Sequence, residues 1–269
     1  MYVIGHFIIC KNYKDSKHTQ MKYYIILLLI LYSCHKDDFL TPEEIAKIDP
    51  VTGSYIYPVE RSEQKLFELG WDKYYDTCII PAKILNHLTD EGLIESCLNY
   101  PPFFNLFYFD YNQDGFDRIH MESNVFDELF IRKNIANKLI SKYESLEVDS
   151  FILSNYSQHG TFTLIYLEII LAQNQIISQM STQEKEELIR EVINKYEYRT
   201  YVLKEELYSS VVSAIILGRI LKILKYDSFM KALDQDQGLC AFFIEKGTFW
   251  DTISTSKIIF YSREYLKQN

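Results

Sequence analysis

A scarcity of glycine and proline is the feature that most constrains the fold of this chain. Its 269 residues include only nine Gly and six Pro. β-Sandwiches and β-barrels need many tight turns, and such turns depend mainly on these two residue types. The chain is 48% hydrophobic and 24% charged, which is ordinary for a protein with a buried core. We therefore expect a mainly α fold.

Start and stop signals for helices recur along the chain. Thr41-Pro42-Glu43-Glu44 combines an N-cap, a proline at the first helical position and a glutamate that completes a capping box. Ser181-Thr182-Gln183-Glu184 is a second capping box, and apolar residues follow it at helical spacing. We predict further helices over residues 81–87 and 89–99, two between 124 and 143, and one each over 161–173 and 207–224. Residues 161–173 are apolar on nearly every side, which predicts a central, buried helix.

Successive helices of similar length predict stacked antiparallel pairs, arranged as a helical bundle or as a HEAT/TPR-like array. No fixed sequence period appears, so the pattern identifies no repeat family. Residues 149–160 are predicted to form a loop. A short strand fits at two places, residues 54–58 and residues 248–261, where β-branched and aromatic side chains are frequent.

A short hydrophobic segment near the N-terminus predicts a signal peptide. Lys22 precedes an uninterrupted apolar run over residues 23–31, which is shorter than the ~20 residues of a membrane-spanning helix. The run ends at Leu31-Tyr32-Ser33-Cys34, which resembles the lipobox of bacterial lipoproteins, although Tyr32 is larger than usual at its position. The resemblance implies cleavage before Cys34 and a lipid on its thiol. Each lipid CH₂ buried in the membrane then contributes about 0.8 kcal/mol to anchoring.

These features divide the chain into four predicted parts. Residues 1–20 are an upstream extension, residues 21–33 the signal peptide, residues 34–60 the lipid anchor and tether, and residues 61–269 a helical domain with a possible division near 149–160. Translation can start at Met1 or at Met21, and both starts give the same mature protein.

Charged residues directly after the predicted anchor indicate a destination. Lys36-Asp37-Asp38 resembles the signal that sends lipoproteins of Bacteroidetes-type bacteria to the outer face of the outer membrane. A second resemblance covers residues 71–143 and is carried by Ile80-Pro81, by the run from Thr89 to Pro101 and by Gln113-Asp114-Gly115-Phe116. This stretch is similar to a segment of uncharacterised lipoproteins of that type, and the resemblance implies location and a helical fold but no activity. We expect an outer-membrane lipoprotein that faces the cell exterior, with a periplasm-facing lipoprotein as the alternative.

The charge of the predicted mature chain limits its partners. Residues 1–33 hold four lysines and one aspartate, so the remainder keeps 24 basic and 36 acidic residues, a net charge of −12. Such a surface repels nucleic acid and anionic lipid, because like charges repel. We expect no nucleic-acid partner, and contact with a membrane only through the lipid on Cys34.

Three cysteines remain when Cys10 and Cys34 are set aside: Cys78, Cys97 and Cys240. An odd number excludes a complete disulfide framework. Three buried thiols, or one disulfide with a leftover thiol, both stay open. Because the sequence contains no CxxC pair, it lacks the pattern of a zinc ribbon or a thioredoxin-like site.

One segment has part of the spacing of a calcium-binding loop. Asp110, Asn112 and Asp114 are oxygen ligands at alternate positions, and Gly115 follows them. Met121 stands where a bidentate glutamate should complete the loop. We therefore interpret the segment as a polar turn between helices, and we expect no metal or other cofactor.

The sequence carries none of the motifs HExxH, GxSxG, GxGxxG or a Walker-type loop. His159, with Ser157 or Cys78 as a nucleophile, is a conceivable catalytic combination, but nothing in the spacing supports it. We interpret His159 as a solvated loop histidine and name no catalytic residue.

Three functional classes stay open. The first is a helical binding or interaction module for a protein or glycan ligand, favoured by the predicted anchor and by 22 Tyr and 17 Phe. The second is an accessory to glycan or nutrient capture at the outer membrane, because Lys36-Asp37-Asp38-Phe39-Leu40 is similar to the start of SusD-like lipoproteins. The third is an envelope hydrolase whose site the sequence does not reveal.

Overall fold

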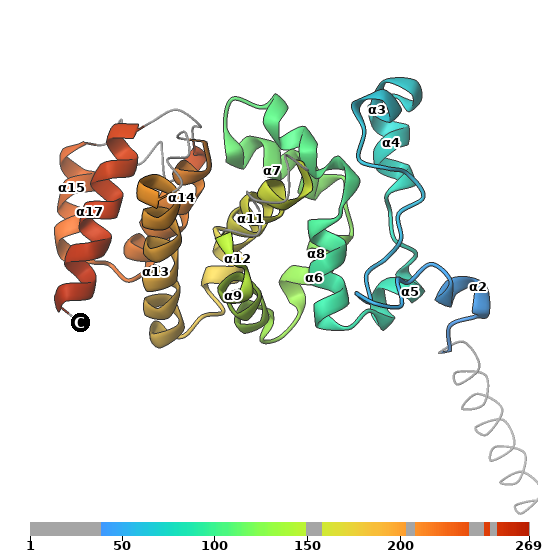
Figure 1. Cartoon of the computed structure of the whole chain (residues 1–269), viewed down its shortest axis with the longest axis horizontal. Coiled ribbons are helices and arrows are strands. Elements are labelled where there is room, and N and C mark those ends of the chain that lie inside the picture. Colours follow the sequence, from blue (N-terminus) through green and yellow to red (C-terminus); the bar gives the residue numbers. More distant parts are fainter. Residues whose placement is uncertain (1–38, 149–157, 203–207, 237–244, 248–251, 269) are drawn as a thin grey trace, which may run out of the picture. The chain divides into compact units, whose positions relative to one another are not determined.

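The computed structural model describes residues 39–148, 158–202, 208–236, 245–247 and 252–268. As predicted, the fold is mainly α, and packed helices make up most of these ranges (Figure 1). Extended pairing within these ranges is minimal, and an isolated antiparallel bridge joins Ile48 and Tyr55. The chain divides into two compact units, residues 1–46 and residues 47–269.

The smaller unit is described from residue 39 onward and contains one short helix, α2 (Pro42–Ile45). The side chain of Thr41 accepts a hydrogen bond from the Glu44 N–H at 3.3 Å, and the Glu44 carboxylate accepts one from the Thr41 N–H at 2.7 Å. This is the predicted capping box. The predicted signal peptide, Cys34 and residues 36–38 lie outside the described residues. In the part of the chain that the structure describes, no helix has the length and apolar character to cross a membrane.

The larger unit begins with short helices. In chain order they are α3 (Glu63–Leu69), α4 (Trp71–Thr77), α5 (Ala82–His87), α6 (Asp90–Leu98), the 3-10 helix η1 (Pro101–Tyr108), α7 (Asn112–Met121), α8 (Val125–Ile131) and α9 (Ile135–Ser145). The helix starts predicted at Pro81 and Thr89 are confirmed, as are the two helices between residues 124 and 143. A cluster of aromatic rings joins η1, α7 and α8. The centroid of the Phe126 ring lies 5.3 Å from that of Phe103 and 5.3 Å from that of Phe116.

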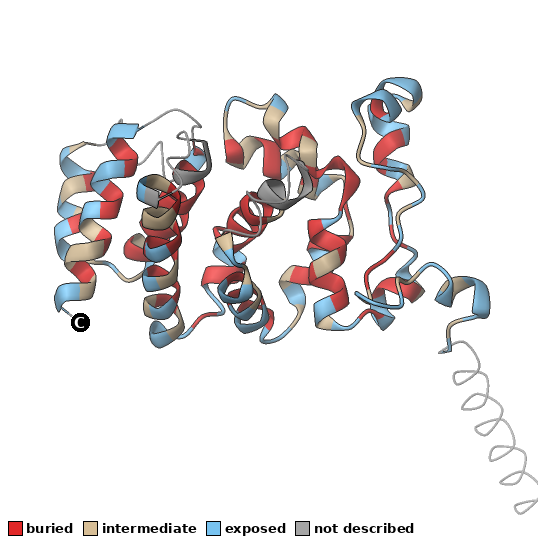
Figure 2. Ribbon diagram, viewed as in Figure 1, coloured by how far each residue is buried: buried red, intermediate tan, exposed pale blue. Residues whose placement is uncertain are grey.

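Longer helices follow. They are α11 (Gln158–Leu171), α12 (Asn174–Ile177), α13 (Thr182–Glu197), the π-helix η2 (Tyr198–Val202), α14 (Tyr208–Ile223), α15 (Asp227–Gln235) and α17 (Thr252–Gln268). Every residue from Leu164 to Leu171 is buried, which confirms the prediction of a central helix (Figure 2). The other strongly apolar helix, α14, packs against α11, α13 and α17.

Two local predictions differ from the structure. The loop predicted over residues 149–160 is wrong at its end, because α11 already begins at Gln158 and so includes His159; residues 149–157 lie outside the described residues. A strand forms neither at 54–58, where Tyr55 makes only the single bridge, nor at 252–261, which belongs to α17; residues 248–251 lie outside the description.

Residues 47–57 pack on α6 and belong to the larger unit, although the sequence assigned them to the tether. The Tyr55 N–H donates to the Ser96 hydroxyl at 2.8 Å, and the Tyr57 hydroxyl donates to the Ser96 carbonyl at 3.0 Å. Gly92 of α6 lies directly against the backbone of Gly53, and a Cβ at Gly92 would overlap the Gly53 carbonyl. A pair of glycines therefore lets this segment approach the helix closely.

Candidate functional site

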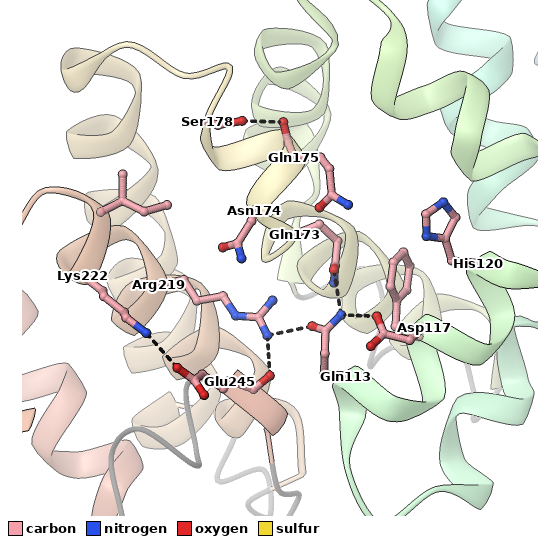
Figure 3. A pocket seen from close by; sticks show the side chains of 12 residues that line it. Gln113, Asp117, His120, Gln173, Asn174, Gln175, Ser178, Arg219, Lys222 and Glu245 are labelled. Atoms are coloured by element: carbon pink, nitrogen blue, oxygen red, sulfur yellow. Dashed lines mark hydrogen bonds and ion pairs between the residues drawn. The ribbon is translucent and has the colours of Figure 1, made fainter. Parts of the chain in front are cut away.

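A pocket of about 660 Å³ opens between α7, α12 and α14 (Figure 3). Its volume is in the range of sites for small ligands. Most small-molecule pockets are lined mainly by apolar side chains. This one is lined mainly by amide, hydroxyl and charged side chains, and a polar ligand is therefore the better match.

The base of the pocket is organised by Arg219, which projects from the strongly apolar helix α14. Its guanidinium donates to the Ala172 carbonyl at 2.7 Å, to Gln113 Oε1 at 2.7 Å and to the Glu245 carbonyl at 3.1 Å. Only 7% of the residue is exposed, and this burial lowers the pKa of Arg219 to about 10. The side chain is still a cation at neutral pH, and these bonds hold it in one position.

Two glutamines extend this network. The Gln113 amide donates to Asp117 Oδ1 at 2.6 Å and to Gln173 Oε1 at 3.1 Å. The Gln173 amide in turn donates to the Ile169 carbonyl at 2.8 Å. The hydrogen-bonding groups at the base of the pocket are thus largely engaged with one another, and the base is pre-ordered.

The rim is different, because α12 presents unengaged amides there. Asn174 and Gln175 are exposed, and their side-chain amides make no hydrogen bond within the described part of the chain. Figure 3 shows both amides directed into the pocket, Asn174 toward Arg219 and Gln175 toward His120. The Ser178 hydroxyl, one turn later, donates to the Gln175 carbonyl at 3.1 Å.

Charges on the pocket lining balance. Arg219 and Lys222 are basic, whereas Asp117 and Glu245 are acidic. Lys222 Nζ lies 2.9 Å from Glu245 Oε1, and the two form an ion pair at the edge of the pocket. With His120 counted as neutral, the lining therefore carries no net formal charge.

A short strap, residues 245–247, lies across α7 and α14 on one side of the pocket. The Asn112 N–H donates to the Gly247 carbonyl at 2.8 Å, and Lys246 pairs with Asp114 at 2.5 Å. Gly247 has a φ of 69°, and a Cβ at this position would meet the Ile215 side chain at 2.6 Å. The positive φ favours glycine here, and any larger residue would also have to push the end of the Ile215 side chain aside.

His120 is the pocket residue with the greatest catalytic potential, and its contacts are structural. Its Nε2 lies 2.8 Å from Asp127 Oδ1, and its ring stacks on Phe116 with centroids 6.0 Å apart. The hydroxyl on the described lining, that of Ser178, donates to a backbone carbonyl and not to this histidine. This arrangement positions an imidazole but does not activate a nucleophile.

A second polar cluster lies inside the helical core, away from solvent. Glu168 Oε1 accepts hydrogen bonds from Tyr143, Arg199 and Ser213, each at 2.8 Å. Glu168 and Ser213 are 0% exposed and Arg199 is 2% exposed. The cluster joins α9, α11, η2 and α14. Because Ser213 is enclosed, we interpret the cluster as structural rather than as a substrate-binding site.

The candidates named from the sequence do not come together as a site. Asn112 and Asp114 lie in the first turn of α7, so the polar turn predicted around them is wrong. Asp114 faces Lys246, and among the described residues no group of His, Cys, Asp and Glu side chains is arranged to hold a metal ion.

The nucleophiles considered from the sequence, Cys78 and Ser157, are not shown to form a catalytic site either. Cys78 and Cys97 are buried free thiols, and burial raises the pKa of Cys78 to about 12, so that it stays protonated at neutral pH. Ser157, Cys240 and the side chain of His159 lie outside the description.

Sequence reasoning missed the pocket itself. Gln113, Gln173, Asn174 and Arg219 are far apart in the chain, and each looks like an ordinary surface residue in its own segment. Arg219 carried a usable signal, because a cation between Gly218 and Ile220 in a strongly apolar helix has to find buried acceptors.

The fold and the site define a helical protein with a pre-ordered polar pocket. Comparisons with protein-family models, with curated proteins and with solved structures find no match for this chain. What the pocket can bind therefore has to follow from the chemistry of its own side chains.

Proposed function

We propose that this chain is a lipid-anchored envelope protein that binds a small ligand in the pocket between α7, α12 and α14. The observation that carries the proposal is the contrast between base and rim. Arg219 and Gln113 are held by protein partners, whereas the amides of Asn174 and Gln175 are unengaged. A rigid base below available donors and acceptors is a pre-organised binding site, which loses little entropy when a ligand enters.

Binding is favoured over hydrolysis by the same geometry. His120 is engaged with Asp127, and Ser178 is engaged with a carbonyl oxygen. A hydrolase needs a nucleophile within hydrogen-bond reach of its base. Of a protein or glycan ligand, the pocket would hold a single residue, a side chain or a chain end. It could also hold a free small molecule.

Binding can be tested by thermal unfolding and calorimetry of the purified lipoprotein in detergent. The panel contains neutral sugars, charged sugars, amino acids, dipeptides and nucleosides. A compound that binds the folded protein raises its melting temperature. We expect at least one class to do so, and we expect Ser178→Trp, which fills the pocket, to abolish the effect. Ser145→Trp, at an exposed position outside the pocket, is the matched control. If no compound in the panel binds, the proposal fails.

The anchor and the location complete the proposal. Lipid on Cys34 would hold the protein to the outer membrane, and Lys36-Asp37-Asp38 would direct it to the cell exterior, with a periplasm-facing lipoprotein as the alternative. Cys34→Ala should abolish lipid labelling and membrane association. Protease added to intact cells should remove the wild-type protein, whereas alanine at residues 36–38 should protect it. Equal protection of both proteins would favour the periplasmic orientation.

A further inference from the structure

We infer that the ligand of this pocket is a neutral sugar, either free or at the end of a glycan chain. The inference rests on the proposed function and names the class of ligand. Three properties of the pocket lead to it: the balance of charge, the chemistry of the unengaged groups and the lack of an open phenyl face on the described lining.

The charge balance disfavours ligands with a net charge. The four charged lining groups already have protein partners: Lys222 pairs with Glu245, Asp117 accepts from Gln113, and Arg219 donates to three oxygens. An ammonium on a ligand would have to displace one of these partners to be paired. A carboxylate would compete with the neutral oxygens that already hold the buried Arg219, and a charge that is desolvated without a partner is costly. Acidic sugars and free amino acids fit poorly for this reason.

The unengaged groups match hydroxyls. Each carboxamide offers two N–H donors and an acceptor oxygen, and each hydroxyl both donates and accepts. Neighbouring hydroxyls on a sugar ring can therefore accept from the nitrogen and donate to the oxygen of one amide. Asn174 and Gln175 provide two such amides side by side on the rim.

Two of the lining side chains, Phe116 and Ile223, are apolar. Ile223 is 41% exposed and can contact a ligand, whereas Phe116 on α7 is only 1% exposed. A sugar ring needs only limited contact for its C–H groups. A nucleobase would need an open aromatic face for stacking. Phe116 does not provide such a face, and His120 already stacks on it.

A peptide is the strongest competitor, because its backbone amides could also pair with Asn174 and Gln175. An extended peptide is normally held along a sheet edge or a continuous groove. This pocket is instead enclosed from three sides by α7, α12 and α14 (Figure 3). The geometry therefore favours a compact ligand.

The test is calorimetric titration of the full lipoprotein in detergent with defined probes. Glucose, galactose, mannose, xylose and N-acetylglucosamine, together with their oligosaccharides, are compared with glucuronic acid, glucosamine, glycine, asparagine and the dipeptide Gly-Asn. We expect binding of at least one neutral sugar. Asn174→Ala and Gln175→Ala should each weaken it by about 3- to 10-fold, the value of a hydrogen bond between neutral groups. Gln183→Ala, which removes an exposed amide on α13, should leave the affinity unchanged.

The outcomes separate the inference from the function on which it rests. Binding of a neutral sugar that depends on Asn174 supports both. A monosaccharide as tight as its oligosaccharides indicates a free sugar, and tighter binding of the oligosaccharide indicates a glycan end. Binding of an amino acid, a dipeptide or a charged sugar in place of neutral ones, with the same dependence on Asn174, overturns the inference and leaves the binding function in place. Binding of none of the probes overturns the inference, and the binding function fails with it if the nucleosides of the wider panel do not bind either.

Discussion

Replacing Glu168 with glutamine removes one negative charge from the centre of the fold and almost no volume. Its Oε1 accepts from Arg199, Tyr143 and Ser213, and Glu168 itself is 0% exposed. Breaking a buried ion pair by neutralising one partner costs about 3–5 kcal/mol, because the remaining charge stays buried. Glutamine keeps the shape and one acceptor oxygen and leaves no cavity, so we expect the lower end, about 3 kcal/mol. For a domain of this size, that lowers the melting temperature by roughly 6–12 °C.

Urea unfolding and thermal unfolding of Glu168→Gln would measure this loss. The double variant Glu168→Gln, Arg199→Met removes both charges and should recover part of the stability, since the unpaired cation is gone. Glu264→Gln, which breaks an exposed pair with Lys267, is the surface control and should leave the melting temperature nearly unchanged. A loss below about 1 kcal/mol in Glu168→Gln, or a double variant less stable than the single one, would refute the reasoning.

Three further predictions concern local features. Ser181→Ala removes the N-cap of α13 and should lower the free energy of unfolding by about 1 kcal/mol in urea titrations; no change would mean that the cap is not needed. Gly92→Ala should expose residues 47–57 to limited proteolysis, because the added Cβ overlaps Gly53; unchanged cleavage would contradict the close contact. Burial raises the pKa of Tyr100 and raises that of Cys78 to about 12, whereas both ionise near pH 9–10 in the unfolded chain. The stability that they contribute is therefore complete below about pH 9 and falls as the pH rises above it, which urea midpoints at increasing pH would show.

Helices were predictable where their signals are local. Thr41 and Ser181 each begin a capping box that can be recognised from four consecutive residues, and both helices form as predicted. The tail was ambiguous because its β-branched residues suit either a strand or a helix. Ser254, Thr255, Ile258 and Ile259 are buried at helical spacing, and packing of α17 against α14 settles the choice.

The pocket was not predictable, because its chemistry arises from tertiary contacts. Gln113 and Arg219 lie in different helices, and their 2.7 Å hydrogen bond exists only once α7 and α14 are packed. At Asp114, in contrast, a local pattern predicted a turn where the structure has a helix. Asn, Asp and Gly suggested a turn, but Gly115 allows α7 to begin close against the Leu106 carbonyl of η1.

The packing of residues 47–57 on α6 would also shorten the tether of the proposed lipid anchor. With lipid on Cys34, as we propose, only residues 35–46 separate the anchor from the packed unit. A fully extended chain of this length reaches about 40 Å, whereas a tether ending at residue 60 would reach about 90 Å. Lys47, the first residue of the larger unit, could therefore lie at most about 40 Å from the lipid-bearing Cys34. Under the proposed anchoring, a short tether would keep the start of the packed unit near the lipid surface, and ligand capture would take place in the layer next to the membrane.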